Sequence, residues 1–141
     1  MIDAKPGAYA ALILRVSLGS MFLAHGLLKL LVFTPAGAAG YFESLGLPAA
    51  LAYLTIVLEL VGGGALIAGV LTRWFSLALA PIPLGAALFA HAGNGWLFSN
   101  EGGGWEFPVF WTIALIVQAL IGAGAFALPR PAPLTALPYS D

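Results

Sequence analysis

The stretch IVLELVGGGALIAGVL, residues 56–71, is apolar along its length except for one carboxylate, that of Glu59. With its apolar neighbours the run is long enough to cross a bilayer, which takes about 20 residues of helix. Hydrophobic residues make up 61% of the chain and charged residues 8%, against roughly 25% charged residues in soluble domains. The composition predicts a membrane protein, and a carboxylate within a span is then a candidate functional group.

Four apolar runs reach the length of a membrane span, and they lie near residues 8–31, 49–71, 73–91 and 107–128. Each is expected to be helical, because irregular backbone or an open sheet edge facing lipid would leave polar groups unpaired. The connections between the runs are too short to hold a soluble domain. We therefore predict an all-α fold, in which residues 1–141 form a single membrane domain, a bundle of four transmembrane helices.

The orientation of the bundle follows from its charges. An even number of spans places both termini on one side of the membrane, together with Lys5, Arg73 and Arg130. Basic residues near span ends favour the cytoplasmic side. Both termini are therefore predicted to be cytoplasmic, and the two longer loops, which hold acidic residues, external.

The two halves of the chain resemble each other. LGSMFLAH at 18–25 matches LGAALFAH at 84–91, and IVLELVGGGA at 56–65 matches IVQALIGAGA at 116–125. The match indicates a duplication that makes two helical hairpins in the same orientation, related by an axis along the membrane normal. Chance similarity between apolar helices is the alternative. The alignment makes His25 equivalent to His91.

Two buried charges have no counterpart in the second half of the chain, where Glu59 aligns with Ala119 and Arg15 with Pro81. A lone ion in a span would cost several kcal/mol. Counting residues from the span ends puts Arg15 and Glu59 at depths that a long arginine side chain can bridge. We therefore predict an ion pair between Arg15 and Glu59, with either a functional role or a purely structural one that fixes helix register.

One face of the first span combines ionisable and apolar residues. Arg15, Leu18, Phe22, His25 and Lys29 are spaced three and four apart, which puts them on one stripe of a helix. Such a stripe is expected to face the bundle interior or a wet cavity that opens outward. The polar residues expected to gather there are His25, Lys29, His91, Glu101 and Glu106, beneath a glycine-containing loop whose Trp96 and Trp105 lie at the membrane interface.

The roles of these polar residues stay open at this level. His25 and His91 suit interfacial hydrogen bonding, contact with a quinone or another ligand, or axial ligation of a b-type haem between two spans. Lys29 also suits a cation that extends its amine to the membrane surface. The chain contains no cysteine, which excludes disulfides, thiolate-bound clusters and c-type haem. No other metal site is predicted.

Several motifs together resemble the DoxX family: HGLLK at 25–29, LELVGGGALIAGVLTR at 58–73, the histidine that closes the third span, and GGGWE at 102–106. The resemblance covers residues 12–128. It implies a small bacterial four-helix protein of the cytoplasmic (inner) membrane. The family takes its name from a subunit associated with quinone-linked thiosulfate oxidation, and some members are linked to membrane oxidoreductase complexes. It supplies no settled catalytic residues.

We therefore expect an accessory or quinone-interacting subunit of a membrane oxidoreductase system, embedded in the lipid bilayer, with a partner subunit that carries the redox cofactor. Glu59 and His25 are the candidate catalytic residues, because they could exchange protons with a bound quinone. The candidate residues for binding the quinone, the suspected cofactor of this chain, are His25, Lys29, His91, Trp96 and Glu106. Whether the chain is itself an enzyme is left open.

Two other functions compete with this expectation. A small-molecule transporter or binding protein would also suit repeated hairpins around a polar midplane site. A structural anchor that docks a partner through its outer loops would need none of the buried charges for activity. A homo-oligomer is compatible with each function, whereas the chain has no basic tract suited to nucleic acid.

Overall fold

The computed structural model describes residues 4–128, and every regular element among them is helical. The elements are α1 (Ala4–Leu27), η1 (Leu28–Val32), α2 (Pro35–Ser44), α3 (Ala49–Ala68), α4 (Thr72–Leu79), α5 (Pro81–Gly85), η2 (Ala86–His91), η3 (Ala92–Asn94) and α6 (Glu106–Ile121). Of these, η1 and η2 are π-helical and η3 is a 3₁₀ turn. The prediction of an all-α fold is confirmed over the described residues.

Three continuous helical segments are long and apolar enough to cross a bilayer, and they cover Lys5–Val32, Ala49–Ala68 and Thr72–Asn94. The fourth apolar helix, α6, is shorter. It ends at Ile121, well before the end of the apolar run near residue 128, because Gly122 adopts a φ of 84°. Similarly, α3 ends at Ala68, where Gly69 adopts a left-handed φ of 75°. These helices make the chain a multi-pass membrane protein.

The connection between the first two spans contains a helix, α2, where a loop was expected. The hydroxyl of Thr34 accepts a hydrogen bond from the backbone N–H of Gly37 at 3.2 Å, and Pro35 occupies the first turn. A threonine cap followed by proline is a common helix start. The helix ends before Gly46, whose φ is 79°. The signals for α2 were therefore present in the sequence.

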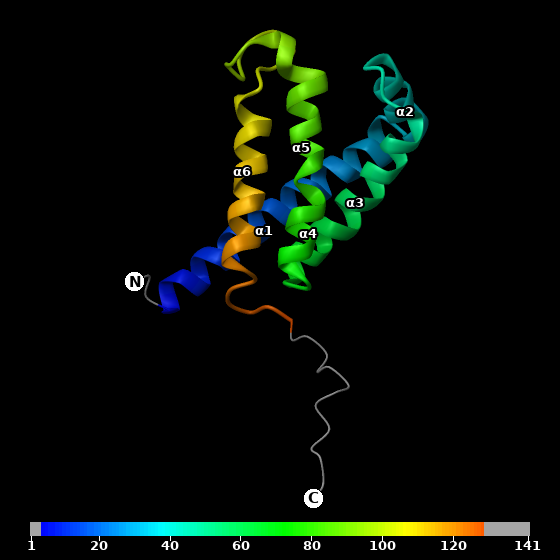
Figure 1. The fold of residues 1–141 in the computed structure, drawn as a ribbon. Helices are drawn as coiled ribbons and strands as arrows, with labels where there is room; N and C mark the ends of the chain where they lie inside the picture. Colours follow the sequence, from blue (N-terminus) through cyan, green and yellow to red (C-terminus); the bar gives the residue numbers. More distant parts are fainter. Residues whose placement is uncertain (1–3, 129–141) are drawn as a thin grey trace, which may run out of the picture.

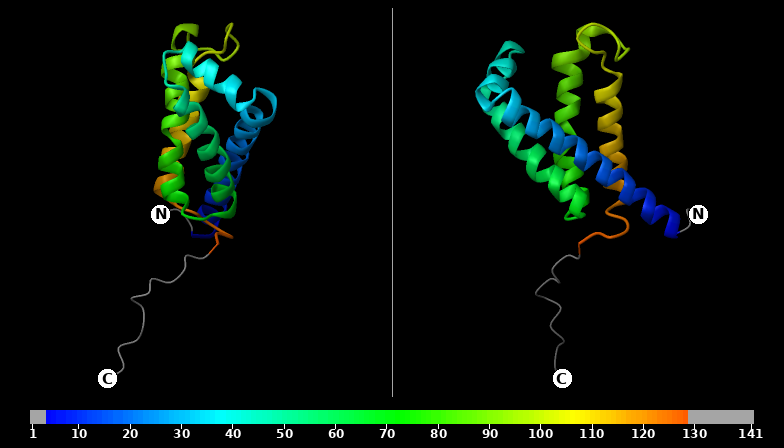
Figure 2. Two further views of the ribbon diagram at one scale, coloured as in Figure 1. Left: turned by 90° about the vertical axis from the view of Figure 1, so that its right-hand side faces the viewer. Right: turned by 180° about the vertical axis from the view of Figure 1, so that it is seen from behind.

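The long helices form two pairs (Figure 1). One pair consists of α1 and α3, which cross the view diagonally, and the other places α4 and α5 against α6. Seen from behind, the pairs diverge toward the end that carries α2 and the loop before α6 (Figure 2). At the opposite end, the N–H of Ala125 donates to the carbonyl of Ala8 at 2.9 Å. The first and last described segments therefore lie together.

A hydrophobic core joins the two pairs. Its buried members are Leu18, Phe22, Leu66, Leu79, Ala80, Trp111 and Leu115. Along α1 this core occupies the stretch between Arg15 and His25, as the stripe of one helix face predicted. Between the levels of Arg15 and His25, the bundle is therefore filled with apolar side chains.

Arg15 is 1% exposed and binds backbone carbonyls instead of a carboxylate. Its Nη1 donates to the carbonyls of Leu66, at 3.0 Å, and Ile67, and its Nη2 donates to that of Ala125 at 2.7 Å. The last carbonyls of a helix lack helical partners and carry partial negative charge. Arg15 thus ties the end of α3, and the segment after α6, to α1.

The predicted ion pair between Arg15 and Glu59 is therefore wrong. The antiparallel register of α1 and α3 puts Arg15 beside Ile67. Ile67 lies about 12 Å along α3 from Glu59, at the usual rise per residue. Depths counted from span ends did not reveal this register, because α1 continues through η1 and is longer than α3.

The α1–α3 register depends on close backbone contact at Gly63. A Cβ added there would lie 2.8 Å from the carbonyl oxygen of Gly19 and 2.9 Å from the backbone nitrogen of Leu23, whereas nothing lies within 4 Å of a Cβ at Gly64. We expect Gly63→Ala to lower the melting temperature of the detergent-purified protein, since such overpacking costs about 1–3 kcal/mol. Gly64→Ala should preserve or raise it, because alanine favours helix. Equal effects of both substitutions on thermal unfolding would contradict the register.

Candidate functional site

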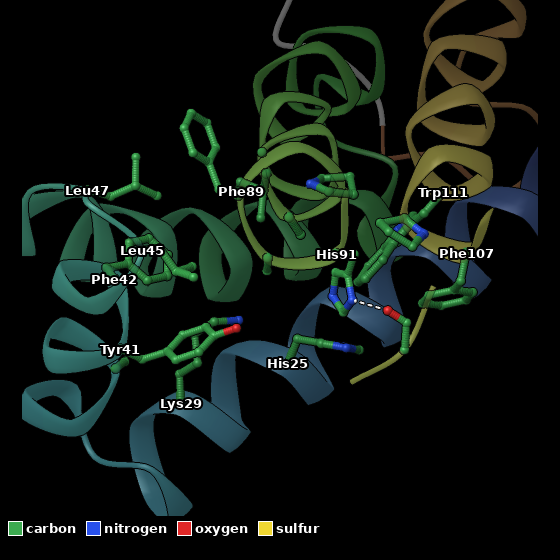
Figure 3. Close-up of a pocket in the computed structure, with 18 of the residues that line it drawn as sticks. His25, Lys29, Tyr41, Phe42, Leu45, Leu47, Phe89, His91, Phe107 and Trp111 are labelled. Atoms are coloured by element: carbon green, nitrogen blue, oxygen red, sulfur yellow. Dashed lines mark hydrogen bonds between the residues drawn. The ribbon is translucent and has the colours of Figure 1, made fainter. Parts of the chain in front are cut away.

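A cavity of about 680 Å³ lies between the diverging helix pairs, on the side of α2 (Figure 3). Its lining comes from α1, η1, α2, α3, α5, η2, the loop before α6, and α6 itself. Most of the lining side chains are apolar, and many are aromatic. The residues with ionisable side chains are His25, Lys29, Tyr41, Glu59 and His91. A largely apolar cavity with a few convergent polar groups is the usual form of a small-molecule site.

The ammonium group of Lys29 is bound to both oxygens of the Glu59 carboxylate, with Nζ at 2.8 Å from Oε1 and 2.9 Å from Oε2. The Glu59 side chain is 2% exposed and that of Lys29 19%. Gly26 makes the approach close, since a Cβ there would lie 3.1 Å from the Cβ of Glu59. Within residues 4–128 this is the one salt bridge. It neutralises the carboxylate that the apolar sequence of α3 carries.

The ring of His25 lies one turn before Lys29 on the same face of α1. Its Nδ1 is 2.8 Å from the carbonyl oxygen of Met21, and its ring packs at 4.9 Å between centroids on Trp111 of α6. A carbonyl oxygen can only accept a hydrogen bond, so Nδ1 carries the hydrogen. In the neutral ring Nε2 is then an acceptor.

His91 closes η2 in the opposite helix pair, and its Nδ1 is 2.9 Å from the carbonyl oxygen of Gly103 in the loop before α6 (Figure 3). The same carbonyl accepts a hydrogen bond from Nδ2 of Asn94 at 3.1 Å. His91 therefore has the same tautomer as His25. The histidines that the predicted repeat made equivalent line one cavity from the two different helix pairs.

The structure brings together four of the predicted site residues, which are His25, Lys29, Glu59 and His91. Trp96 and Glu106, predicted to contact a cofactor, lie outside the cavity lining. Trp96 is half exposed and packs edge to face on Trp105 at 4.6 Å between centroids. Oε1 of Glu106 accepts a hydrogen bond from the N–H of Phe98 at 2.9 Å. Both therefore shape the loop, and Glu101 is exposed on it.

The aromatic walls of the cavity were not predicted from the sequence. Trp111 is 7% exposed and contacts the rings of Phe22, His25 and Phe107. The aromatic run at the start of α6, FPVFW, was a signal for this wall. Tyr41 and other lining residues come from α2, and they were missed because that helix was.

The Lys29–Glu59 pair predicts strong energetic coupling. Lys29→Met or Glu59→Gln alone should lower the free energy of unfolding, by up to about 3–5 kcal/mol where a buried charge loses its partner. The double variant should lose less than the sum of the two, as measured by denaturant unfolding in mixed micelles. Arg15→Met combined with Glu59→Gln is the control and should be additive. Additivity at Lys29–Glu59 with coupling at Arg15–Glu59 would restore the pairing that the structure excludes.

Comparison with known proteins identifies the family of this chain. Residues 10–92 match the model of the DoxX family. A Haemophilus influenzae protein, "Uncharacterized protein", is 34% identical over 85% of this chain and 88% of its own length. "Putative oxidoreductase CatD" of Bacillus subtilis is 32% identical over 83% of this chain and 82% of its own. "Inner membrane protein YqjF" of Escherichia coli is 30% identical over 84% and 88%. No solved structure matches. The chain belongs to the DoxX family.

Proposed function

We propose that this protein binds a membrane quinone in its cavity and serves as an accessory subunit of a membrane oxidoreductase. The observation that carries the proposal is the composition of the cavity: apolar and aromatic walls enclose a buried ion pair and two histidines. A quinone has a flat ring with oxygen atoms at opposite edges and an apolar tail. Such walls suit the ring and tail, and the polar groups suit its oxygens.

Each polar residue of the cavity would have its own role in binding and reducing the quinone. Lys29 keeps one N–H beyond the two that bind Glu59, and it would orient an oxygen of the quinone. His25 and Glu59 would exchange protons with the ligand, and His91 would contact it from the other hairpin. Reduction of a quinone to a hydroquinone takes two electrons and two protons. His25 and Glu59 would each pass on a proton that they first take up from water entering the cavity. The electrons would come from a redox group of the partner subunit.

The comparisons support this assignment in part. The name of the Bacillus subtilis relative refers to an oxidoreductase, and that of the Escherichia coli relative to the inner membrane. We extend both descriptions to this chain. We also propose that α6 and the segment after it complete a fourth span, giving one domain of two same-facing hairpins with cytoplasmic termini. The placement of His25 and His91 in one cavity supports the repeat.

The packing of the bundle favours binding over passage through it. Leu18, Phe22 and Leu66 are nearly or fully buried, and they belong to the core that separates the level of His25 from that of Arg15. A transported solute would have to cross this packed layer. A ligand that enters and leaves on the cavity side, as a membrane quinone would, does not.

Quinone binding can be tested by filling the cavity. Ala90 lines it, whereas Leu88, two residues earlier on η2, is 61% exposed and does not. In lipid nanodiscs, the wild-type protein should bind a benzoquinone with a decyl tail, or its hydroquinone, saturably by calorimetry. Ala90→Trp should weaken this binding at least about tenfold, because an indole takes the space of the ligand ring. Leu88→Trp should leave it unchanged. Absence of saturable binding to the wild type, in both redox forms, would refute the proposal.

A further inference from the structure

In each histidine of the cavity, the N–H group is already engaged in a hydrogen bond, and the other ring nitrogen remains as an acceptor. Nδ1 of His25 is engaged with the carbonyl of Met21, and Nδ1 of His91 with that of Gly103. The Nε2 atoms have no hydrogen-bond partner among residues 4–128. They are not among the buried side-chain atoms of that region that lack a partner, so they are solvent-accessible, and both residues line the cavity. The neutral rings thus offer two lone pairs to a ligand.

We propose that the cavity selects the reduced form of its ligand, a hydroquinone, whose hydroxyl groups donate hydrogen bonds to Nε2 of His25 and His91. This inference rests on the proposed function. A quinone carries carbonyl oxygens, which only accept hydrogen bonds, so it would place lone pairs against lone pairs at both rings. A buried acceptor left without a donor is destabilising. The two redox forms have nearly the same size and shape, so the apolar walls do not distinguish them.

The remaining polar groups of the cavity do not reverse this preference. The indole N–H of Trp111 is buried without a partner among residues 4–128, and an oxygen of either redox form can accept its hydrogen bond. Lys29 has one further N–H, which either a hydroquinone hydroxyl or a quinone carbonyl can accept. The hydroxyl of Tyr41 can donate or accept, and it therefore suits both forms. The oxygens of Glu59 are held by Lys29 and are acceptors only. Discrimination is thus assigned to the two histidines.

Selective binding has a consequence for the partner reaction. A site that holds the hydroquinone more tightly than the quinone shifts the bound couple toward the reduced form. The reduction potential of the bound couple then rises, by about 30 mV for each factor of ten in affinity of a two-electron couple. Reduction of the bound quinone by a partner subunit becomes more favourable, and product release becomes slower.

The test compares three ligands that share one ring and one tail, under anaerobic conditions. They are the decyl benzoquinone, its hydroquinone, and the dimethyl ether of that hydroquinone, which has no hydroxyl hydrogen. The hydroquinone should bind the wild-type protein in nanodiscs about tenfold more tightly than the other two, since two ordinary hydrogen bonds are at stake. His25→Leu and His91→Leu should each reduce this ratio. Trp96→Phe, outside the cavity, should preserve it.

The outcomes separate the two proposals. Equal affinity for all three ligands, or tighter binding of the quinone, would overturn the preference while leaving quinone binding intact. No binding of any ligand would remove the proposed function and the preference with it. The tautomers offer a second readout that needs no variant, because the chain has only two histidines. Nitrogen NMR of ¹⁵N-histidine protein should show hydrogen on Nδ1 of both neutral rings, and hydrogen on Nε2 would overturn the preference.

Discussion

The structure depends on the cost of holding the carboxylate of Glu59 inside an apolar helix. Lys29 offsets this free-energy cost by binding both carboxylate oxygens. A lysine beyond the end of α1 can do so because η1 continues the helix and Gly26 brings α1 close to α3. The pair therefore couples the helix contact to the cavity, and it places a neutral but strongly polar group in an otherwise apolar wall.

The second buried charge, Arg15, is accommodated by different chemistry. Its guanidinium has five donors in a planar fork, and the structure uses it to bind carbonyls from the end of α3 and from the segment after α6. Carbonyls at a helix end lack partners within the helix, and the guanidinium supplies donors there. The two cations thus act on either side of the core around Phe22: Arg15, within α1, stabilises the fold, and Lys29, in η1, belongs to the cavity.

The sequence predicted the three long apolar helices and the polar stripe on α1, because hydrophobic length and helical period are local properties. It also expected His25, Lys29 and His91 to gather near one end of the bundle, as the structure has them. It missed α2 and made the last helix too long. It mispaired Arg15 with Glu59, because register depends on where two helices touch. It also could not orient the side chains in the loop before α6 and at the start of that helix, so Trp96 and Glu106 were expected in the cavity. The place of Trp111 in the cavity wall was missed, because the sequence does not distinguish an aromatic residue that lines a cavity from one that packs between helices.

The most direct test of this account is the spacing of the Lys29 and Glu59 side chains in a lipid bilayer. Solid-state NMR can measure the dipolar coupling between ¹⁵Nζ of lysine and ¹³Cδ of glutamate. Because the chain has only two lysines, Lys5→Arg leaves the Lys29 signal alone. We expect a strong coupling that Glu59→Gln abolishes. No coupling at Lys29, together with contact between the guanidinium of Arg15 and the Glu59 carboxylate, would contradict the account.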